Sequence, residues 1–260
     1  MSERTIEKVA EVLRAALEAA AGAALERLAA AREAETKSDG SPVTAADRAA
    51  EAAALEVIQG AFPGDAILGE ETGEHAGGGW AWTIDPIDGT RGFVRGGESW
   101  GPLIAAAEAG VVRAGGMALA VRGRHYWAAE GMGAWRGDER IALAAPPPLE
   151  RATLVVGELR PLLADPGGAA VRELIAEAAC VRCPGDLASF AFFLDGHADA
   201  WLEAGVQPWD LGPFPILARE AGAVFTTARG TQDLGEGTGL VAREPLHGTL
   251  LARWKVALEG

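Results

Sequence analysis

The stretch Trp82-Thr-Ile-Asp85-Pro-Ile-Asp88-Gly-Thr90 joins an apolar run to two carboxylates and a glycine. Asp85 and Asp88 are three residues apart across a proline, and a tight turn at the end of a strand would bring both to one point. Gly89 and Thr90 follow, where the start of a helix offers backbone N–H groups to a phosphate. The alternative is an ordinary turn, because Asp-Pro and Asp-Gly are common turn dipeptides.

Two other short segments carry acidic side chains of the same kind. They are Gly69-Glu70-Glu71 and Trp209-Asp210. Hard dications prefer several oxygen ligands, and one carboxylate placed between two ions neutralises both. Together with the two aspartates of the first stretch, these segments suggest a magnesium site that cleaves phosphate esters. For Asp210 alone, capping of the helix that follows is the simpler interpretation.

The bulk composition limits the possible partners. The chain has 260 residues, enough for one large domain or two small ones, with 49% hydrophobic and 23% charged residues. Its net charge of −14 argues against a nucleic-acid or anionic-membrane surface, but bound metals can reverse the sign locally for a phosphorylated substrate. No run approaches the ~20 apolar residues of a membrane span, and the start lacks a signal-peptide pattern, so we expect a cytoplasmic protein.

The two cysteines, Cys180 and Cys183, form a CxxC motif by spacing. A zinc site needs further ligands, and the four histidines are scattered through the chain. Redox chemistry needs the motif at the start of a helix, whereas Val181 lies in apparent strand sequence. A structural role is therefore the preferred interpretation.

Apolar periodicity predicts two helices, over residues 3–33 and 45–59, the second capped by Thr44. Strands are expected next, at 66–68, 80–84, 102–108, 111–120 and 124–129. The proline-rich run Ala144–Leu149 predicts a boundary between an N-terminal subdomain, 1–145, and a C-terminal α/β subdomain, 146–260. The second half is expected to alternate strands and helices, with strands at 152–156, near 181, at 198–203 and at 223–227, and helices at 167–179, 186–195 and 212–221.

Taken together, these motifs resemble the inositol monophosphatase superfamily of magnesium-dependent, lithium-sensitive phosphatases. The resemblance covers nearly the whole chain. It rests on Lys37-Ser-Asp39-Gly-Ser-Pro-Val-Thr44-Ala-Ala-Asp47, Gly69-Glu70-Glu71, Asp85-Pro-Ile-Asp88-Gly-Thr90, and Trp209-Asp210 followed by Glu220-Ala-Gly222. It implies a mixed α/β, layered αβαβα sandwich of the inositol monophosphatase/fructose-1,6-bisphosphatase type, two or three Mg²⁺ ions per site, and a homodimer.

The resemblance also implies two ligand sets. The first Mg²⁺ would be held by Glu70, Asp85 and the Ile87 carbonyl. The second would be held by Asp85, Asp88 and Asp210. The first ion would lower the pKa of a bound water, and the second would take up charge on the leaving oxygen.

Other family roles carry over to residues around these two ligand sets. Thr90 and Asp47 resemble the pair that orients and deprotonates the attacking water. Taken alone, Asp47 is more simply an exposed acid in the first turn of a helix. The N–H groups of Gly89 and Thr90 would bind phosphate oxygens. Glu71 would support the site, and Lys37 either approaches the metals on a loop or is a solvated surface lysine.

Within the superfamily, the runs Asp88–Gly97, Trp100–Ile104 and Arg124–Trp135 resemble the histidinol-phosphate phosphatase branch. Asp186 and Glu203 would then face the alcohol part of the substrate. A carboxylate pair suits a cationic amino alcohol such as histidinol, although the same groups can accept sugar hydroxyls. For Asp186, a helix N-cap is an equally good interpretation.

Three prolines depart from the family pattern. Pro102 replaces a usual threonine, and Pro213 and Pro215 lie in the helix expected after Asp210, where Pro215 removes a second donor and can displace that turn. The sequence therefore does not decide whether the Asp210 carboxylate points at the second metal ion. Two rival functions also remain: the same in-line hydrolysis of another ester (inositol 1-phosphate, fructose 1,6-bisphosphate or an adenosine bisphosphate), and a regulatory, protein-binding family member.

Overall fold

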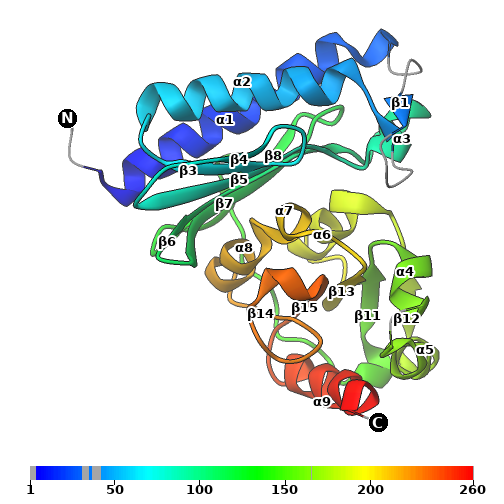
Figure 1. Ribbon diagram of the computed structural model, residues 1–260. Helices are drawn as coiled ribbons and strands as arrows, with labels where there is room; N and C mark the ends of the chain where they lie inside the picture. The colour runs from blue at the N-terminus through cyan, green and yellow to red at the C-terminus, as the bar shows by residue number, and fades with distance from the viewer. Residues whose placement is uncertain (1–3, 31–34, 37–41, 165, 260) are drawn as a thin grey trace.

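The computed structural model describes residues 4–30, 35–36, 42–164 and 166–259 (Figure 1). Helices and sheets alternate in layers, in the order helix pair, larger sheet, helices, smaller sheet, helices. This arrangement confirms the predicted αβαβα sandwich. Lys37 and Asp39 lie outside the described residues.

The outer layer of the N-terminal half is the helix pair α1 (Ile6–Glu26) and α2 (Ala45–Ala61). Thr5 caps α1, which gives way to a short 3-10 turn at Leu28–Ala30, so this helix is shorter than the predicted 3–33. Thr44 caps α2 as predicted. Buried alanines on both helices pack over one face of the larger sheet, because a side chain of one methyl lets helices approach closely.

The larger sheet has eight strands in the spatial order β10-β9-β8-β7-β6-β5-β3-β4. Their bounds are β3 (Ala66–Gly69), β4 (Gly73–His75), β5 (Trp80–Asp88), β6 (Gly101–Glu108), β7 (Val111–Leu119), β8 (Arg124–Ala129), β9 (Gly133–Arg136) and β10 (Glu139–Arg140). Neighbouring side chains on β6 enter opposite layers: Ile104 packs with the helix pair and Leu103 with the middle layer. A two-stranded ribbon, β1 (Glu35–Thr36) with β2 (Pro42–Val43), precedes α2.

The acidic stretch lies inside a strand rather than in a turn after it, which corrects the prediction that the strand ends at Ile84. β5 continues to Asp88, and its pairing with β6 shifts register between Asp85 and Asp88. Pro86 lies in the shift because it has no N–H to donate to the ladder. The resulting bulge changes the direction of the side chains that follow it.

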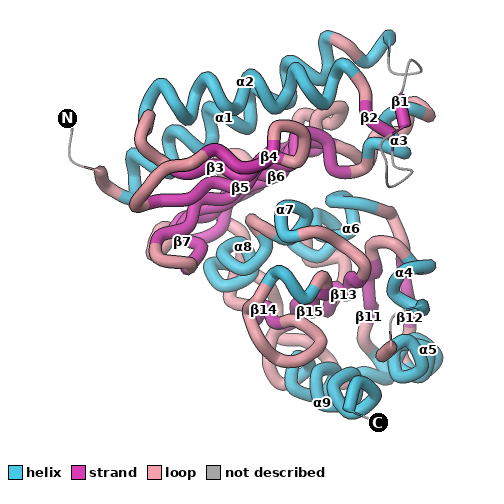
Figure 2. Tube along the Cα trace, viewed as in Figure 1, coloured by secondary structure: helices cyan, strands magenta, loops and turns pink. Residues whose placement is uncertain are grey.

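The C-terminal half is built on a five-stranded sheet of order β12-β11-β13-β15-β14. Its strands are β11 (Thr153–Val156), β12 (Cys180–Arg182), β13 (Ala200–Ala204), β14 (Val224–Thr226) and β15 (Thr238–Ala242). Val155 and Trp201 pack inward with α6 (Asp186–Leu194) and α8 (Phe214–Glu220). The outer face is covered by α4 (Leu159–Ala164), α5 (Gly168–Glu177) and α9 (Leu246–Glu259) (Figure 2).

The helix predicted over 212–221 is two helices. α7 (Pro208–Leu211) ends before Gly212, and α8 begins after Pro213, which is its N-cap. Pro215 lies in the first turn of α8, where its missing N–H has no intrahelical partner to lose. Sequence reasoning did not predict α4, α9, β4, β10 or β15. None of the helices in the described part of the chain combines the length and apolar composition that a membrane span requires.

Candidate functional site

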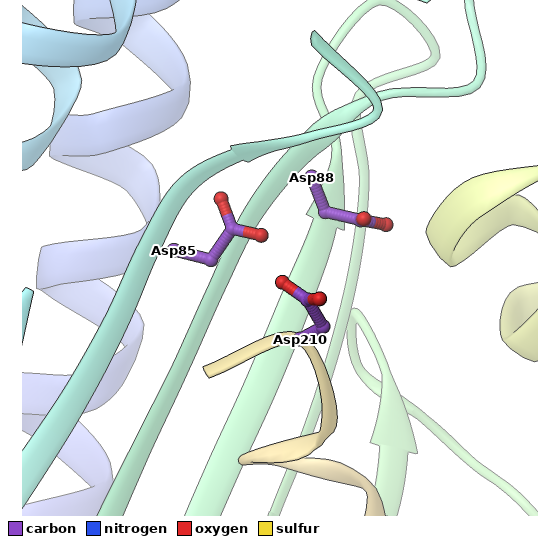
Figure 3. A group of neighbouring side chains, drawn as sticks. All are labelled: Asp85, Asp88 and Asp210. Atoms are coloured by element: carbon purple, nitrogen blue, oxygen red, sulfur yellow. The ribbon is translucent and has the colours of Figure 1, made fainter. Parts of the chain in front are cut away.

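Three carboxylates converge where the two halves of the chain meet. Asp85 and Asp88 come from the bulged end of β5, and Asp210 comes from α7. One oxygen of each lies within 4.8 Å of the others. Figure 3 shows Asp210 reaching from its helix toward the two aspartates of β5.

The electrostatics of this cluster are unfavourable without a cation. Burial raises the pKa of Asp85 well above its usual value, and the charges of Glu70, Asp88 and Asp210 raise it further. Burial likewise raises the pKa of Asp88, followed by the charges of Asp186 and Asp210. Because every donor is a carboxylate oxygen and the charges repel, this set fits hard divalent cations, which would replace repulsion with attraction.

The prolines do not displace Asp210 from the cluster. The Gln207 N–H donates to Asp210 Oδ2 at 2.8 Å, which closes a capping box at the start of α7. Gly212 lets the chain approach β5, since a Cβ there would lie 2.6 Å from Thr83 Oγ1. Asp210 is thus the third residue of α7 and not the N-cap of the helix that follows, because Gln207 caps α7 and Pro213 caps α8, so the N-cap interpretation is wrong. Its carboxylate completes the capping box and also belongs to the cluster.

Glu70 lies beside the cluster, in the turn after β3, but is not one of the three carboxylates that share the 4.8 Å spacing. Its backbone N–H donates to the Ile84 carbonyl at 3.0 Å, and its charge helps to raise the pKa of Asp85. The Ile87 carbonyl accepts the Thr90 hydroxyl at 3.0 Å. The structure therefore brings both of these predicted groups to the end of β5.

Asp47 faces the same region from α2. It is 1% exposed, so the interpretation as an exposed acid is wrong. Its Oδ2 accepts the Thr44 N–H at 2.7 Å and the Thr44 hydroxyl at 2.6 Å, while Oδ1 accepts the Thr90 hydroxyl at 3.3 Å. The capping box thus fixes the carboxylate and leaves one oxygen directed to Thr90.

The turn after β5 depends on a glycine. Gly89 has φ 87 and is the N-cap of the short helix α3 (Thr90–Val94). A Cβ at this position would lie 2.9 Å from the Asp186 carboxylate and 3.0 Å from the Ser99 carbonyl. Only glycine combines this left-handed conformation with so close an approach.

Asp186 begins α6 but does not cap it, so the N-cap interpretation is wrong. Gly185 is the N-cap, and Asp186 has φ 48, a conformation that few residues other than glycine adopt. The next N–H, of Leu187, donates to Asp88 Oδ2. Burial raises the pKa of Asp186 to about 6, helped by Glu158 and opposed by Arg91.

Glu203 lies near the end of β13 and is 6% exposed. Its Oε1 accepts the backbone N–H of Glu158 at 3.0 Å and that of Ala204 at 3.3 Å. Burial nevertheless raises the pKa of Glu203 to about 8, with Glu158 and Asp186 adding to the rise. Glu203, Asp186 and Glu158 therefore form an acidic subsite on the C-terminal side of the cluster.

The cysteine motif lies beside this subsite rather than in a metal centre. Both cysteines are free. The Cys183 thiol donates to the Gly157 carbonyl at 3.0 Å, and burial raises its pKa, which disfavours the reactive thiolate.

Sequence reasoning missed two acidic residues of the site. Glu158 follows a predicted strand as an isolated exposed acid, and nothing in its local pattern indicates a neighbour. Glu51 is fully buried on α2 and contacts the turn that carries Glu70 and Glu71. The available signal was its position four residues after Asp47, among alanines on the apolar face of the helix.

Comparisons with known proteins agree on one family. A family model described as "Inositol monophosphatase family" matches residues 5–257. A histidinol-phosphatase from Chlorobaculum parvum is 35% identical over 208 residues, 80% of either chain. One from Mycobacterium tuberculosis is 35% identical over 229 residues, covering 84% of this chain and 86% of its own.

A solved structure supports the same fold. The extragenic suppressor protein suhB from Bartonella henselae superposes with a TM-score of 0.87, covering 95% of this chain and 98% of its own. Its sequence identity is 24%, so this likeness concerns the fold alone.

Proposed function

The chain belongs to the inositol monophosphatase family and is a phosphoric monoester hydrolase, and from that premise we propose that it hydrolyses histidinol phosphate with Mg²⁺. The observation that carries the metal part is the convergence of Asp85, Asp88 and Asp210 within 4.8 Å. The substrate part draws on the acidic subsite beside them and on the histidinol-phosphatase relatives.

In this proposal the carboxylates divide between two ions. Glu70, Asp85 and the Ile87 carbonyl hold the first, and Asp85, Asp88 and Asp210 hold the second. The ions supply a water of lowered pKa and neutralise charge on the leaving oxygen. Glu71 supports the site from the turn that also carries Glu70.

Thr90 and Asp47 handle the proton of the attacking water. The Thr90 hydroxyl would take the proton of that water as it gives its own proton to Asp47 Oδ1, 3.3 Å away, so the threonine is unchanged and the proton ends on Asp47. Asp47 suits a general base because Thr44 holds its other oxygen in place. The Gly89 and Thr90 N–H groups bind phosphate oxygens, and attack is in line, without a phosphoenzyme.

The acidic subsite favours a cationic alcohol. A cation beside Glu203 and Asp186 would compensate their burial and bring both pKa values down, so binding and ionisation reinforce each other. Inositol 1-phosphate is the second candidate, since these carboxylates can also accept hydroxyl hydrogens and the family model carries that name.

A phosphate-release screen tests the substrate. Histidinol phosphate, inositol 1-phosphate, fructose 1,6-bisphosphate and an adenosine bisphosphate are compared with Mg²⁺ and with EDTA. We expect the highest kcat/KM for histidinol phosphate and no turnover with EDTA. A higher kcat/KM for inositol 1-phosphate would reject the histidinol assignment.

By the same resemblance, we propose that the protein acts as a homodimer in the cytoplasm, in histidine biosynthesis. Light scattering on the purified protein measures the mass of the assembly. Complementation of a histidine auxotroph that lacks its histidinol-phosphatase tests the pathway.

A further inference from the structure

A fully buried carboxylate holds the turn that follows β3. Glu51 lies on α2 and is 0% exposed. Its Oε2 accepts the Glu71 N–H at 2.8 Å, and its Oε1 accepts the Thr72 N–H at 2.9 Å and the Thr72 hydroxyl at 2.5 Å. One side chain thus binds three donors of the segment that begins with Glu70.

The end of β3 is shaped to admit this carboxylate. A Cβ at Gly69 would lie 2.4 Å from Glu51 Oε1 and 2.9 Å from Thr72 Oγ1. Any larger residue at position 69 would push the carboxylate away from the turn. Position 69 therefore requires glycine because a side chain there would overlap the Glu51 carboxylate.

Glu51 shares helix α2 with Asp47, the residue that contacts Thr90. Asp47 and Glu51 are four residues apart on α2, so they lie on the same face of the helix one turn apart. Asp47 contacts Thr90 and Glu51 contacts the turn after Gly69. A single rigid helix therefore sets the distance between the water-activating pair and Glu70.

We propose that Glu51 is a positioning residue that aims the Glu70 carboxylate at the first metal ion. The inference rests on the proposed function in assigning Mg²⁺ to Glu70. Partners that orient a metal ligand without touching the metal typically change metal affinity when they are replaced. A carboxylate that only stabilised the fold would leave that affinity unchanged.

The first test is Glu51→Gln. Its amide group keeps one acceptor oxygen but places an NH₂ against the donors of the other, so the turn loses one of its two acceptors while the side-chain volume stays nearly the same. We expect calorimetric titration of the metal-free protein to give a Mg²⁺ Kd raised about 10-fold or more. The rise in Tm on addition of Mg²⁺ should shrink accordingly.

Asp65→Asn is the matched control. Asp65 is also a buried carboxylate, bound by Arg4 at 2.8 Å and by the Trp82 indole N–H at 2.8 Å, but it lies before the other end of β3. This variant should lower the Tm of the metal-free protein and keep the wild-type Kd for Mg²⁺.

Gly69→Ala is a second route that changes no charge and does not depend on the folding of Glu51→Gln. The added methyl displaces the Glu51 carboxylate, so Mg²⁺ binding should weaken as in Glu51→Gln. Adding Glu51→Asp to Gly69→Ala shortens the acid and relieves the overlap, so the two substitutions should combine non-additively.

Wild-type Kd for Mg²⁺ in whichever of Glu51→Gln and Gly69→Ala folds overturns the positioning role. Weakened binding in Asp65→Asn to the same degree overturns it as well, since loss of stability would then explain the effect. The proposed function fails separately, if the wild type binds Mg²⁺ but releases phosphate from none of the esters tested.

Discussion

Glu203→Gln tests the electrostatics of the acidic subsite independently of catalysis. Both backbone N–H groups that bind Glu203 donate to the same oxygen, Oε1. The single carbonyl oxygen of glutamine can take that place, so the substitution removes the titrating group and keeps both hydrogen bonds. The expected effect is a change in how stability depends on pH.

The magnitude follows from the pKa of Glu203, which burial raises from 4.5 to about 8. The native state therefore binds this proton more tightly than the unfolded chain. The stabilisation is complete below about pH 4.5 and is lost as the pH rises through about 8. At about 1.4 kcal/mol per pKa unit, the wild type should lose about 2.5 kcal/mol between about pH 5.5 and 7.5 that Glu203→Gln keeps.

Urea denaturation of both proteins in EDTA, followed by tryptophan fluorescence, measures this difference. The carboxylates of the metal cluster titrate in both proteins, so their contribution cancels in the comparison. We expect the two curves of unfolding free energy against pH to diverge as the pH rises, with the variant more stable. Parallel curves would refute the conclusion that burial raises the pKa of Glu203.

Substitutions at three further positions test the cluster and the turn. Asp85→Asn removes a buried charge that three neighbouring carboxylates repel; phosphate release should be lost while the Tm of the metal-free protein rises at neutral pH, and undiminished turnover contradicts the metal assignment. Thr90→Val should lower kcat by about 10²–10⁴-fold with KM nearly unchanged, whereas Thr90→Ser should retain activity in the same assay. Gly89→Ala places a methyl 2.9 Å from Asp186 at φ 87; its unfolding free energy in urea should fall by at least about 1–2 kcal/mol.

Much of the fold could be predicted because its pattern is local. The strands at 102–108, 111–120 and 124–129 alternate with glycine turns, and the structure has them within one residue at each end. The end of β5 could not be predicted in this way, because Pro86 normally indicates that a strand stops. A bulge depends on how the neighbouring strand pairs, which one segment does not contain. α9 was missed although its buried residues Leu246, Leu250 and Trp254 recur every four residues, a spacing that indicates a helix.

The residues of the candidate site likewise fall into those that a local sequence pattern indicates and those whose role depends on tertiary packing. Acids such as Asp85 stand out in sequence because they directly follow an apolar run. Glu51 does not stand out, since its role depends on α2 packing over a turn twenty residues away. The left-handed backbone of Asp186 is equally invisible, because it arises from the approach of α6 to Gly89.

The bond from the Leu187 N–H to Asp88 joins the two halves of the chain, and so does the contact of Asp210 with β5. Each half of the polypeptide therefore carries only part of the site: the residues around the end of β5 belong to the N-terminal half, and Asp210 and the acidic subsite belong to the C-terminal half. A truncated or split gene that parts the chain near the segment 141–148 would yield two inert fragments, and activity would return only when both were expressed and docked.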